Sequence, residues 1–255
     1  MPRDQDRGIF LKYDGEFLIF YIKRNDKMVY VVSNLHGNYT KFKQLLSAIS
    51  FKDTDLMYVL GDIVDYGDES MELIGDLSVR YNVYPIVGEH DYTALKMLSG
   101  FEEMVKSGET PDKKFITKMT EWVADGGQST LDSFRTLDAE MKEGILDYLT
   151  DMTIFEEAEV RGKKYLLVHA GIAGYKAGVE LDDLKPEAFF TEPLDLTKKY
   201  FDDKTVIVGH TPTTEDNGGD GRIFYGNGSI AIDCGEARGG TVGCLRLDDM
   251  KEFYV

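Results

Sequence analysis

The chain has 255 residues, 42% of them hydrophobic and 12% aromatic, which is enough to bury the core of one sizeable domain. Its 29 lysines and arginines against 46 aspartates and glutamates give a formal net charge of −17. This acidity disfavours nucleic acid and anionic membranes as partners, because phosphate backbones and lipid headgroups are held by lysine and arginine.

Residues 1–27 are predicted to form an amino-terminal extension built on a β-hairpin. Asp14-Gly15 separates two apolar stretches, residues 9–13 and 16–23, as hairpin turns do. We expect the hairpin to extend a sheet or cover its edge, with a partner or dimer contact as the alternative. The apolar run of residues 17–22 is too short for a secretory signal or for a membrane span of roughly 20 residues.

The two cysteines, Cys234 and Cys244, are too few for a disulfide framework. Both lie in apolar, strand-like sequence, so we expect buried free thiols in a reducing compartment. Together with the missing signal, this predicts a cytoplasmic protein. No feature of the sequence selects an oligomeric state.

Five short apolar runs predict buried strands of an α/β sheet, at residues 28–32, 56–60, 84–87, 165–167 and 205–208. Each run ends in a polar motif, and the motifs contain all four histidines: Ser33-Asn34-Leu35-His36-Gly37, Gly61-Asp62-Ile63-Val64-Asp65-Tyr66-Gly67, Gly88-Glu89-His90-Asp91, Val168-His169-Ala170-Gly171 and Gly209-His210-Thr211. Such sheets bind ligands beyond the carboxyl ends of their strands. The histidine and aspartate side chains are therefore expected to converge in space.

Helices are predicted between these runs. Apolar residues at i, i+3, i+4 and i+7 spacing mark an amphipathic helix after the first motif: Phe42, Leu45, Leu46 and Ile49. Residues 92–151 contain apolar residues in a helical pattern, which predicts a helical insert that caps the crevice at the strand ends. Ser129 or Thr130 is the expected N-cap of the helix that holds Leu131 and Phe134. The only tryptophan, Trp122, is expected in the core.

The motifs resemble, in order and spacing, those of the phosphoprotein-phosphatase branch of the calcineurin-like metallophosphoesterases. That branch carries Gly-Asp-x-His-Gly, Gly-Asp-x-Val-Asp-Arg-Gly, Gly-Asn-His-Glu, His-Ala-Gly and a late metal-binding histidine. The resemblance extends over residues 28–255 and is strongest for small bacterial members. It implies one domain of two mixed β-sheets sandwiched and flanked by α-helices. It also implies a metal-dependent phosphoesterase similar to bacterial serine/threonine protein phosphatases.

The resemblance implies two divalent metal ions, manganese, iron or zinc, all of which suit imidazole and carboxylate ligands. The implied ligands are the bridging Asp62, with Asn34 and His36 for the first ion and Glu89, His169 and His210 for the second. Asn34 replaces a family aspartate and Glu89 replaces a family asparagine, so negative charge moves from the first ion to the second. We therefore expect the Glu89 site to fill first and the Asn34 site to bind more weakly.

For catalysis, the resemblance implies attack by a metal-bound hydroxide on phosphorus. His90 is the implied general acid for the leaving alkoxide, and Asp65 is the residue that orients it. Three functions stay open: a phosphoesterase acting on a phosphorylated small molecule or phosphoprotein, a catalytically silent relative that acts as a binding protein, and a dinucleoside polyphosphate hydrolase. The four histidines and Asp65 favour an enzyme.

Two departures concern the substrate. Tyr66 stands where the family has the arginine that clamps the phosphoryl group, and Glu192 stands where a second arginine is expected. Because one well-placed donor contributes roughly 3–4 kcal/mol of transition-state stabilisation, losing both predicts a weak or altered activity. Arg238 is the candidate replacement, and Tyr66 and Arg238 are the predicted substrate-binding residues. Lys41 and Arg222 are weaker candidates.

Overall fold

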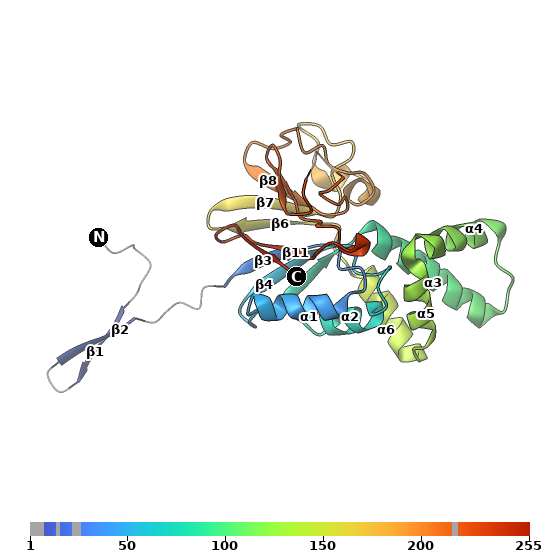
Figure 1. Ribbon diagram of the computed structural model, residues 1–255, viewed down its shortest axis with the longest axis horizontal. Helices are drawn as coiled ribbons and strands as arrows, with labels where there is room; N and C mark the ends of the chain where they lie inside the picture. The colour runs from blue at the N-terminus through green and yellow to red at the C-terminus, as the bar shows by residue number, and fades with distance from the viewer. Residues whose placement is uncertain (1–7, 14–15, 22–26, 216–218) are drawn as a thin grey trace.

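Two five-stranded sheets form the body of the molecule in the computed structural model, which describes residues 8–13, 16–21, 27–215 and 219–255 (Figure 1). The first sheet has the order β12 (Lys251–Tyr254), β11 (Gly243–Arg246), β3 (Val29–Val32), β4 (Leu56–Leu60) and β5 (Val83–Ile86). The second has the order β6 (Phe155–Val160), β7 (Lys163–Val168), β8 (Lys204–Val208), β10 (Ser229–Ala231) and β9 (Phe224–Tyr225). Each combines three parallel strands with antiparallel neighbours, which confirms the two mixed sheets predicted.

The central strands β3 and β4 of the first sheet are covered on both faces, which explains why they are continuous apolar runs in the sequence. On one face, Val31 packs with Leu167 and Ile207 of the second sheet. On the other face, Val32 packs in a cluster with Phe42, which belongs to helix α1 (Tyr39–Ala48). Helix α2 (Ser70–Ser78) contributes to the same cluster. The predicted amphipathic helix after the first motif is therefore confirmed.

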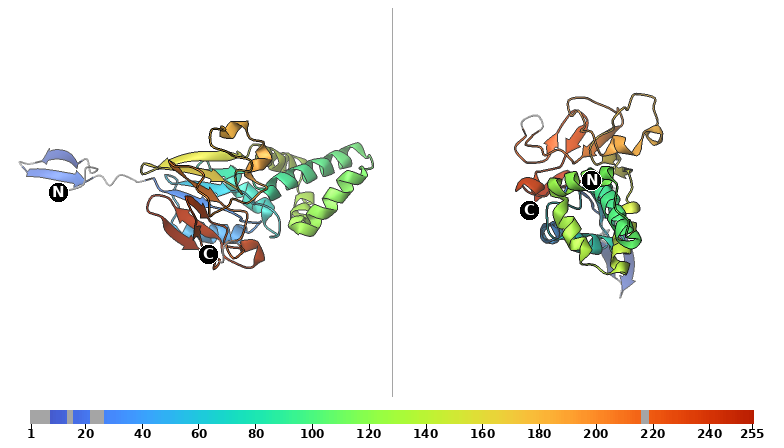
Figure 2. Two further views of the ribbon diagram at one scale, coloured as in Figure 1. Left: turned by 90° about the horizontal axis from the view of Figure 1, so that it is seen from above. Right: turned by 90° about the vertical axis from the view of Figure 1, so that its right-hand side faces the viewer.

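A helical cap projects from one end of the two sheets (Figure 2). It consists of α3 (Glu89–Ser107), α4 (Lys113–Trp122), the π-helical turn η1 (Val123–Gly127), α5 (Gln128–Arg135) and α6 (Ala139–Thr150). The expected N-cap at Ser129 or Thr130 is wrong, because α5 already begins at Gln128. The Thr130 hydroxyl instead donates to the Asp65 carboxylate at 2.7 Å. Trp122 is buried, as expected.

Strands β1 (Gly8–Tyr13) and β2 (Glu16–Tyr21) pair antiparallel as a separate two-stranded sheet, and Tyr13 is opposite Glu16. The predicted turn at Asp14-Gly15 lies outside the described residues. Among the described residues of the second half, the loops contain the 3₁₀ helices η2 (Leu181–Asp183), η3 (Pro186–Phe189) and η4 (Glu236–Arg238). Both cysteines are free and buried, as predicted. In the described ranges, no helix combines the length and apolar character that crossing a membrane requires.

Candidate metal centre and active site

The residues predicted for the site lie in loops that follow strand ends, and the backbone of these loops is unusual. Nine non-glycine residues in the described ranges have positive φ, and six lie in these loops: Asn34, His36, Asp62, Asp65, Tyr66 and His210. This left-handed conformation costs of order 1–3 kcal/mol for a non-glycine residue and collects at functional sites. The surrounding fold therefore holds these loops in a shape that their own sequence disfavours.

Two glycines allow the loops after β4 and β5 to touch. A Cβ atom at Gly88 would lie 2.3 Å from the backbone nitrogen of Asp62, and one at Gly61 would lie 2.5 Å from the backbone nitrogen of Gly88. Any side chain at these positions would push the motifs apart. The buried Asp91 ties the same two loops together, since its carboxylate accepts hydrogen bonds from the backbone N–H groups of Gly88 and Ile63 at 3.0 and 2.9 Å. Sequence reasoning assigned no role to Asp91.

Asp62, His169 and His210 form a compact cluster at the meeting point of three loops. One carboxylate oxygen and two imidazole nitrogens lie within 4.8 Å of one another. Nε2 of His169 lies 3.3 Å from Oδ1 of Asp62 and 3.2 Å from Nδ1 of His210. Nδ1 of His169 lies 2.7 Å from the carbonyl oxygen of Leu60. Since a carbonyl only accepts, Nδ1 carries a proton, and in a neutral His169 the lone pair of Nε2 would point into the cluster. Burial lowers the pKa of His169, but the charge of Asp62 and the hydrogen bonds to Asp62 and Leu60 together outweigh it and raise this pKa above its ordinary value.

Burial and the neighbouring charges shift the pKa values of the residues in and beside the cluster. Burial alone would raise the pKa of Asp62, but the neighbouring His169 and other histidines lower it well below its ordinary value. Burial and the neighbouring His169 lower the pKa of His210 to about 4. Burial also lowers the pKa of His36, against the opposing charge of Asp62. His210 is therefore neutral near pH 7, which is the form in which imidazole binds a metal.

Glu89 lies at the margin of this cluster. It is the first residue of α3, and its Oε2 is 4.0 Å from Nδ1 of His210. Burial, followed by the charge of Asp62, raises the pKa of the Glu89 carboxyl group. Its side chain is 48% exposed, so a rotation can bring it towards Asp62 and His210 or leave it in solvent.

Asn34 faces the cluster with its nitrogen, which differs from the expectation that its oxygen would hold an ion. The backbone N–H of His210 lies 3.0 Å from Oδ1 of Asn34, and an N–H can only donate, so the oxygen must face it. Nδ2 is thereby directed to Oδ2 of Asp62, at 3.2 Å, and to Nε2 of His36, at 3.4 Å. Nε2 of His36 and Oδ2 of Asp62, the two atoms that would coordinate the first ion, instead accept hydrogens from this amide.

The donor set of Asp62, His169 and His210 fits one divalent ion. It combines a carboxylate with two imidazole nitrogens, and the hydrogen bond from His169 to Leu60 is the kind of support that metal-binding histidines have. The set around Asn34 and His36 does not fit a second ion as it stands, because an amide N–H₂ group repels a cation.

His90 and Asp65 form a hydrogen-bonded pair beside the cluster. Nδ1 of His90 lies 2.8 Å from Oδ2 of Asp65, which is fully buried. Asp65 also accepts from the indole N–H of Trp122, at 2.8 Å, and from the hydroxyl of Thr130, at 2.7 Å. Burial opposes protonation of His90, but the bond to Asp65 and the charges of Asp62, Asp65 and Asp125 raise its pKa to about 9. His90 is therefore protonated at neutral pH.

Tyr66 occupies the place of the missing family arginine and is bound to the helical cap. Its hydroxyl donates to Oδ1 of Asp125 at 3.0 Å, and its ring contacts His36 edge-on, with ring centroids 5.0 Å apart. Burial and the bond to Asp125 raise the pKa of Tyr66 to about 12. The phenol is therefore a neutral donor on the wall of the site.

Arg238 enters the same space from the loop after β10. A cavity of about 260 Å³ opens over the cluster, and its lining includes Asp62, His90, Tyr66 and Arg238. The guanidinium of Arg238 forms an ion pair with Glu215, which also lines this cavity. The two predicted substrate-binding residues, Tyr66 and Arg238, are thus brought together.

The other residues suspected of contacting substrate are placed elsewhere. Glu192 is exposed and is absent from the cavity lining. Nζ of Lys41 lies 3.0 Å from the carbonyl oxygen of Gly240, and Arg222 stacks on the ring of Tyr254, 4.2 Å from its centroid. None of these three charged side chains lines the cavity over the cluster.

Asp233 lines the cavity and was not predicted for the site. It is 3% exposed and lies just after β10, so the strand-end signal that marked the other motifs applies to it as well. Burial raises its pKa to about 6, although the N–H group of Gly235 donates to it at 2.8 Å. Its role in the loop is to hold the turn that carries Arg238.

Comparison with known proteins identifies the family of this chain. The sequence model of the calcineurin-like phosphoesterase family matches residues 27–232. A symmetrical bis(5′-nucleosyl)-tetraphosphatase of Buchnera aphidicola subsp. Schizaphis graminum is 36% identical over 80 residues, which cover 31% of this chain and 29% of the relative. Serine/threonine-protein phosphatase 2 of Salmonella typhimurium is 28% identical over 157 residues, which cover 60% and 64%.

The alignments span less than two thirds of the length of each of these relatives. Among solved structures, a metallophosphoesterase from Sphaerobacter thermophilus superposes with a TM-score of 0.53 at 19% identity, covering 90% of this chain and 87% of its own. At this identity the likeness concerns the fold alone.

Proposed function

This chain belongs to the calcineurin-like phosphoesterase family, and we propose that it is a hydrolase of phosphoric esters working at the Asp62, His169 and His210 cluster. The observation that carries this proposal is the pair of His90 and Asp65 beside the cluster, at 2.8 Å. A metal site alone would also suit a silent binding protein. A departing oxygen needs a proton, and a protonated histidine that a buried carboxylate holds beside the site can supply it.

The metal centre is proposed to hold one tightly bound divalent ion, coordinated by Asp62, His169 and His210, with Glu89 able to join it. Manganese, iron and zinc all suit these ligands. Such an ion, when bound, supplies positive charge at the phosphoryl oxygens and acidifies a water molecule at neutral pH. Asn34 supports a single ion, because its amide hydrogens occupy the lone pairs of His36 and Asp62 that a second ion needs.

In the proposed reaction, water supplies the oxygen that attacks phosphorus, and the bond between phosphorus and the leaving-group oxygen breaks. Nε2 of His90 donates the proton that the leaving oxygen takes up, and solvent restores it afterwards. Asp65 fixes the ring of His90 through Nδ1, so that Nε2 faces the cavity. Trp122 and Thr130 in turn hold both oxygens of Asp65, which prevents the carboxylate from rotating away.

Arg238 is proposed to bind the phosphoryl group in place of the two family arginines. In the structure it is paired with Glu215, and their side chains are 64% and 47% exposed. An exposed ion pair contributes only about 0–1 kcal/mol, whereas a guanidinium binds phosphate through two parallel hydrogen bonds. A phosphate in the cavity therefore displaces Glu215 at small cost. The hydroxyl of Tyr66 is a second, neutral donor only if it releases Asp125, to which it now donates.

The domain organisation is part of this proposal. Residues 28–255 are taken as one catalytic domain, residues 92–151 as its helical insert and residues 1–27 as an extension outside it. All residues assigned to the reaction lie in the first of these ranges, with Trp122, Asp125 and Thr130 supplied by the insert.

The proposal is tested by metal analysis and turnover measured on the same preparation. Protein purified with added manganese or zinc is assayed on phenyl phosphate and bis(4-nitrophenyl) phosphate, together with His90→Gln and His169→Gln. Metal-dependent turnover that falls in both variants, with metal lost only from His169→Gln, supports the enzyme. Bound metal with no turnover on either ester overturns it and favours the silent binding protein.

A further inference from the structure

Asp233 leaves one carboxylate oxygen free in the cavity over the cluster. The residue is 3% exposed and lines this cavity. Its Oδ1 accepts from the N–H group of Gly235 at 2.8 Å, and among the described residues none donates to Oδ2. The described side-chain oxygens that are sealed from solvent without a partner belong to other residues: Ser33, Tyr148, Thr213 and Ser229. Oδ2 of Asp233 is therefore open to the cavity.

The other carboxylates in the lining each face a side-chain partner: Asp62 faces His169, Glu215 pairs with Arg238, and Asp125 accepts from Tyr66. Asp233 has only the backbone N–H group of Gly235. Burial raises the pKa of Asp233 to about 6, so the carboxylate still carries its charge at neutral and mildly alkaline pH. Because the side chain is buried, water screens this charge poorly, and the charge acts on whatever occupies the cavity.

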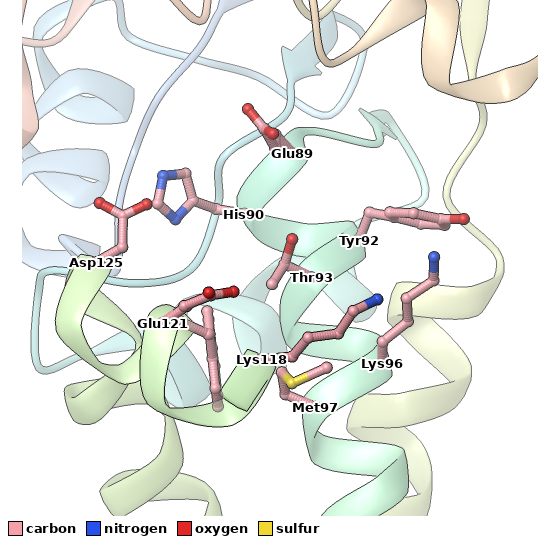
Figure 3. A pocket seen from close by; sticks show the side chains of 10 residues that line it. Glu89, His90, Tyr92, Thr93, Lys96, Met97, Lys118, Glu121 and Asp125 are labelled. Carbon is pink, nitrogen blue, oxygen red and sulfur yellow. The ribbon is translucent and has the colours of Figure 1, made fainter. Parts of the chain in front are cut away.

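Asp233 and His90 enter the cavity from different parts of the fold. His90 follows β5 of the first sheet, and Figure 3 shows its ring beside the carboxylate of Asp125, which the helical cap supplies. Asp233 follows β10 of the second sheet, and Arg238 lies in the same loop. Because the cavity measures only about 260 Å³, a phosphoryl group that lies over Asp62 has the Asp233 carboxylate as a neighbour.

Few positive charges are available to offset this carboxylate. The proposed site holds one ion, and Arg238 is the only lysine or arginine among the described residues that lines the cavity. A phosphate monoester carries about two negative charges at neutral pH, whereas a diester carries one. Like charges held close together away from water repel strongly. The second charge of a monoester is therefore disfavoured beside Asp233.

We propose that Asp233 is a specificity-determining residue, and that its free carboxylate oxygen makes the site select phosphoryl groups with a single negative charge. The preferred substrate class is then a phosphodiester, and a dianionic monoester is a weak substrate. This inference rests on the proposed function, because it takes the cavity over Asp62 as the place where phosphorus lies.

The first test compares two esters that share a leaving group and differ in charge. 4-Nitrophenyl phosphate is a dianion at about pH 8, and methyl 4-nitrophenyl phosphate is a monoanion. We expect the metal-loaded wild-type protein to have the higher kcat/KM for the diester. In Asp233→Asn, which keeps an acceptor for the N–H group of Gly235, the ratio of the monoester value to the diester value should rise at least tenfold. The change in this ratio is independent of the intrinsic reactivity of the two esters.

The matched control is Asp182→Asn, which removes the same charge from η2, outside the cavity lining. It should leave the ratio unchanged. Asp233→Ser is the second variant, since its hydroxyl can also accept from Gly235 and carries no charge, and it should raise the ratio as Asp233→Asn does. A higher wild-type kcat/KM for the monoester, an unchanged ratio in a folded, metal-loaded Asp233 variant, or an equal rise in Asp182→Asn would each overturn the assignment.

The second test measures binding without turnover. Sulfate and dimethyl phosphate are inert tetrahedral anions, the first with two negative charges and the second with one. Calorimetric titration of the metal-loaded protein gives the affinity for each anion. We expect Asp233→Asn to bind sulfate at least tenfold more tightly relative to dimethyl phosphate than the wild-type protein does. A change of equal size for both anions, or no change for either, overturns the selection by charge.

The failure of this inference and the failure of the proposed function are distinguishable. If the protein hydrolyses neither ester but Asp233→Asn strengthens sulfate binding selectively, the proposed function fails and Asp233 still selects the charge of a bound anion. If both esters are hydrolysed and neither the ratio nor the relative affinity for sulfate depends on Asp233, the phosphoesterase stands and the role of Asp233 is wrong.

Discussion

The side-chain nitrogen of Asn34 lies 3.2 Å from Oδ2 of Asp62 and donates a hydrogen bond to it. Both residues are buried, each only 2% exposed, so this contact is not exchanged with solvent. The carboxamide stands where the family has an aspartate, and its hydrogens take the place of a cation between His36 and Asp62. We therefore expect this one side chain to limit the number of ions that the site binds.

The first prediction concerns that side chain. The wild-type protein is expected to bind one equivalent of manganese or zinc tightly, and Asn34→Asp is expected to bind two, because the substitution restores an anionic ligand beside His36. Without metal, the introduced carboxylate would face Asp62 in a buried site, so the free energy of unfolding should fall by about 1–3 kcal/mol or more. Metal content by mass spectrometry and thermal unfolding with and without chelator measure both effects.

Asn227→Asp is the control for this variant, since Asn227 lies in the loop between β9 and β10, outside the cavity over the cluster, and the same charge is added there. It should leave metal content and the effect of chelator unchanged. Two ions of equal affinity in the wild-type protein would contradict the single-ion site.

The second prediction separates the role of His90 from metal binding. His90→Gln should reduce turnover of an alkyl phosphate about 10²–10⁴-fold, because general acid catalysis contributes that much when the leaving oxygen needs a proton. The loss should be much smaller for 4-nitrophenyl phosphate, whose leaving group departs as an anion. Metal content should not change.

Asp65→Asn extends this test to the residue that positions His90. It should reduce turnover in the same leaving-group-dependent pattern, because an amide replaces the anion that fixes the ring of His90. A loss of equal size for both leaving groups in either variant would show that these residues stabilise the site without taking part in proton transfer.

The third prediction concerns Arg238. Arg238→Ala should lower kcat/KM for phenyl phosphate at least tenfold, which corresponds to roughly 1.4 kcal/mol. Glu215→Gln should raise the affinity for inorganic phosphate, because it removes the competing partner of the guanidinium. Steady-state kinetics and inhibition by inorganic phosphate measure the two effects.

Arg222→Ala is the matched control, because Arg222 stacks on Tyr254 away from the cavity. If Arg238→Ala and Arg222→Ala behave alike, Arg238 is a loop residue that pairs with Glu215 and does not bind substrate.

The fourth prediction restores an arginine of the family. Tyr66→Arg alone should bring little gain, because Asp125, which now accepts from the Tyr66 hydroxyl, would pair with the new guanidinium. Combined with Asp125→Asn, it should raise hydrolysis of a phosphate monoester at least tenfold, roughly 1.4 kcal/mol. Glu192 is left unchanged, since it does not line the cavity.

Turnover of phenyl phosphate and metal content are measured together for these two variants. A double variant that folds, binds metal and gains no activity would place the defect in the metal centre, and the silent binding protein would then be the better account.

The sequence alone located the apolar runs that form β3, β4, β5, β7 and β8 and the histidine motifs that follow them. The other strands of the two sheets, β6, β9, β10, β11 and β12, were not predicted as strands. Strands such as β4 are continuous apolar runs because both faces are covered, and each is followed by a polar motif because binding sites form beyond the carboxyl ends of such strands. These are local properties of the chain, so they can be recognised without knowing which segments are neighbours. The N-cap at Ser129 or Thr130 failed for the opposite reason, because a distant residue, Asp65, takes the hydroxyl of Thr130.

Only the tertiary structure decided which atoms face one another. The sequence shows that Asn34 is an amide, but a backbone N–H at His210 determines that its nitrogen faces Asp62. The pairing of Arg238 with Glu215 likewise depends on two loops that approach from different strand ends. The helices and strands place the loops relative to one another, and this placement decides which side chains from distant parts of the chain meet. No local pattern of residues encodes the distance between two such side chains.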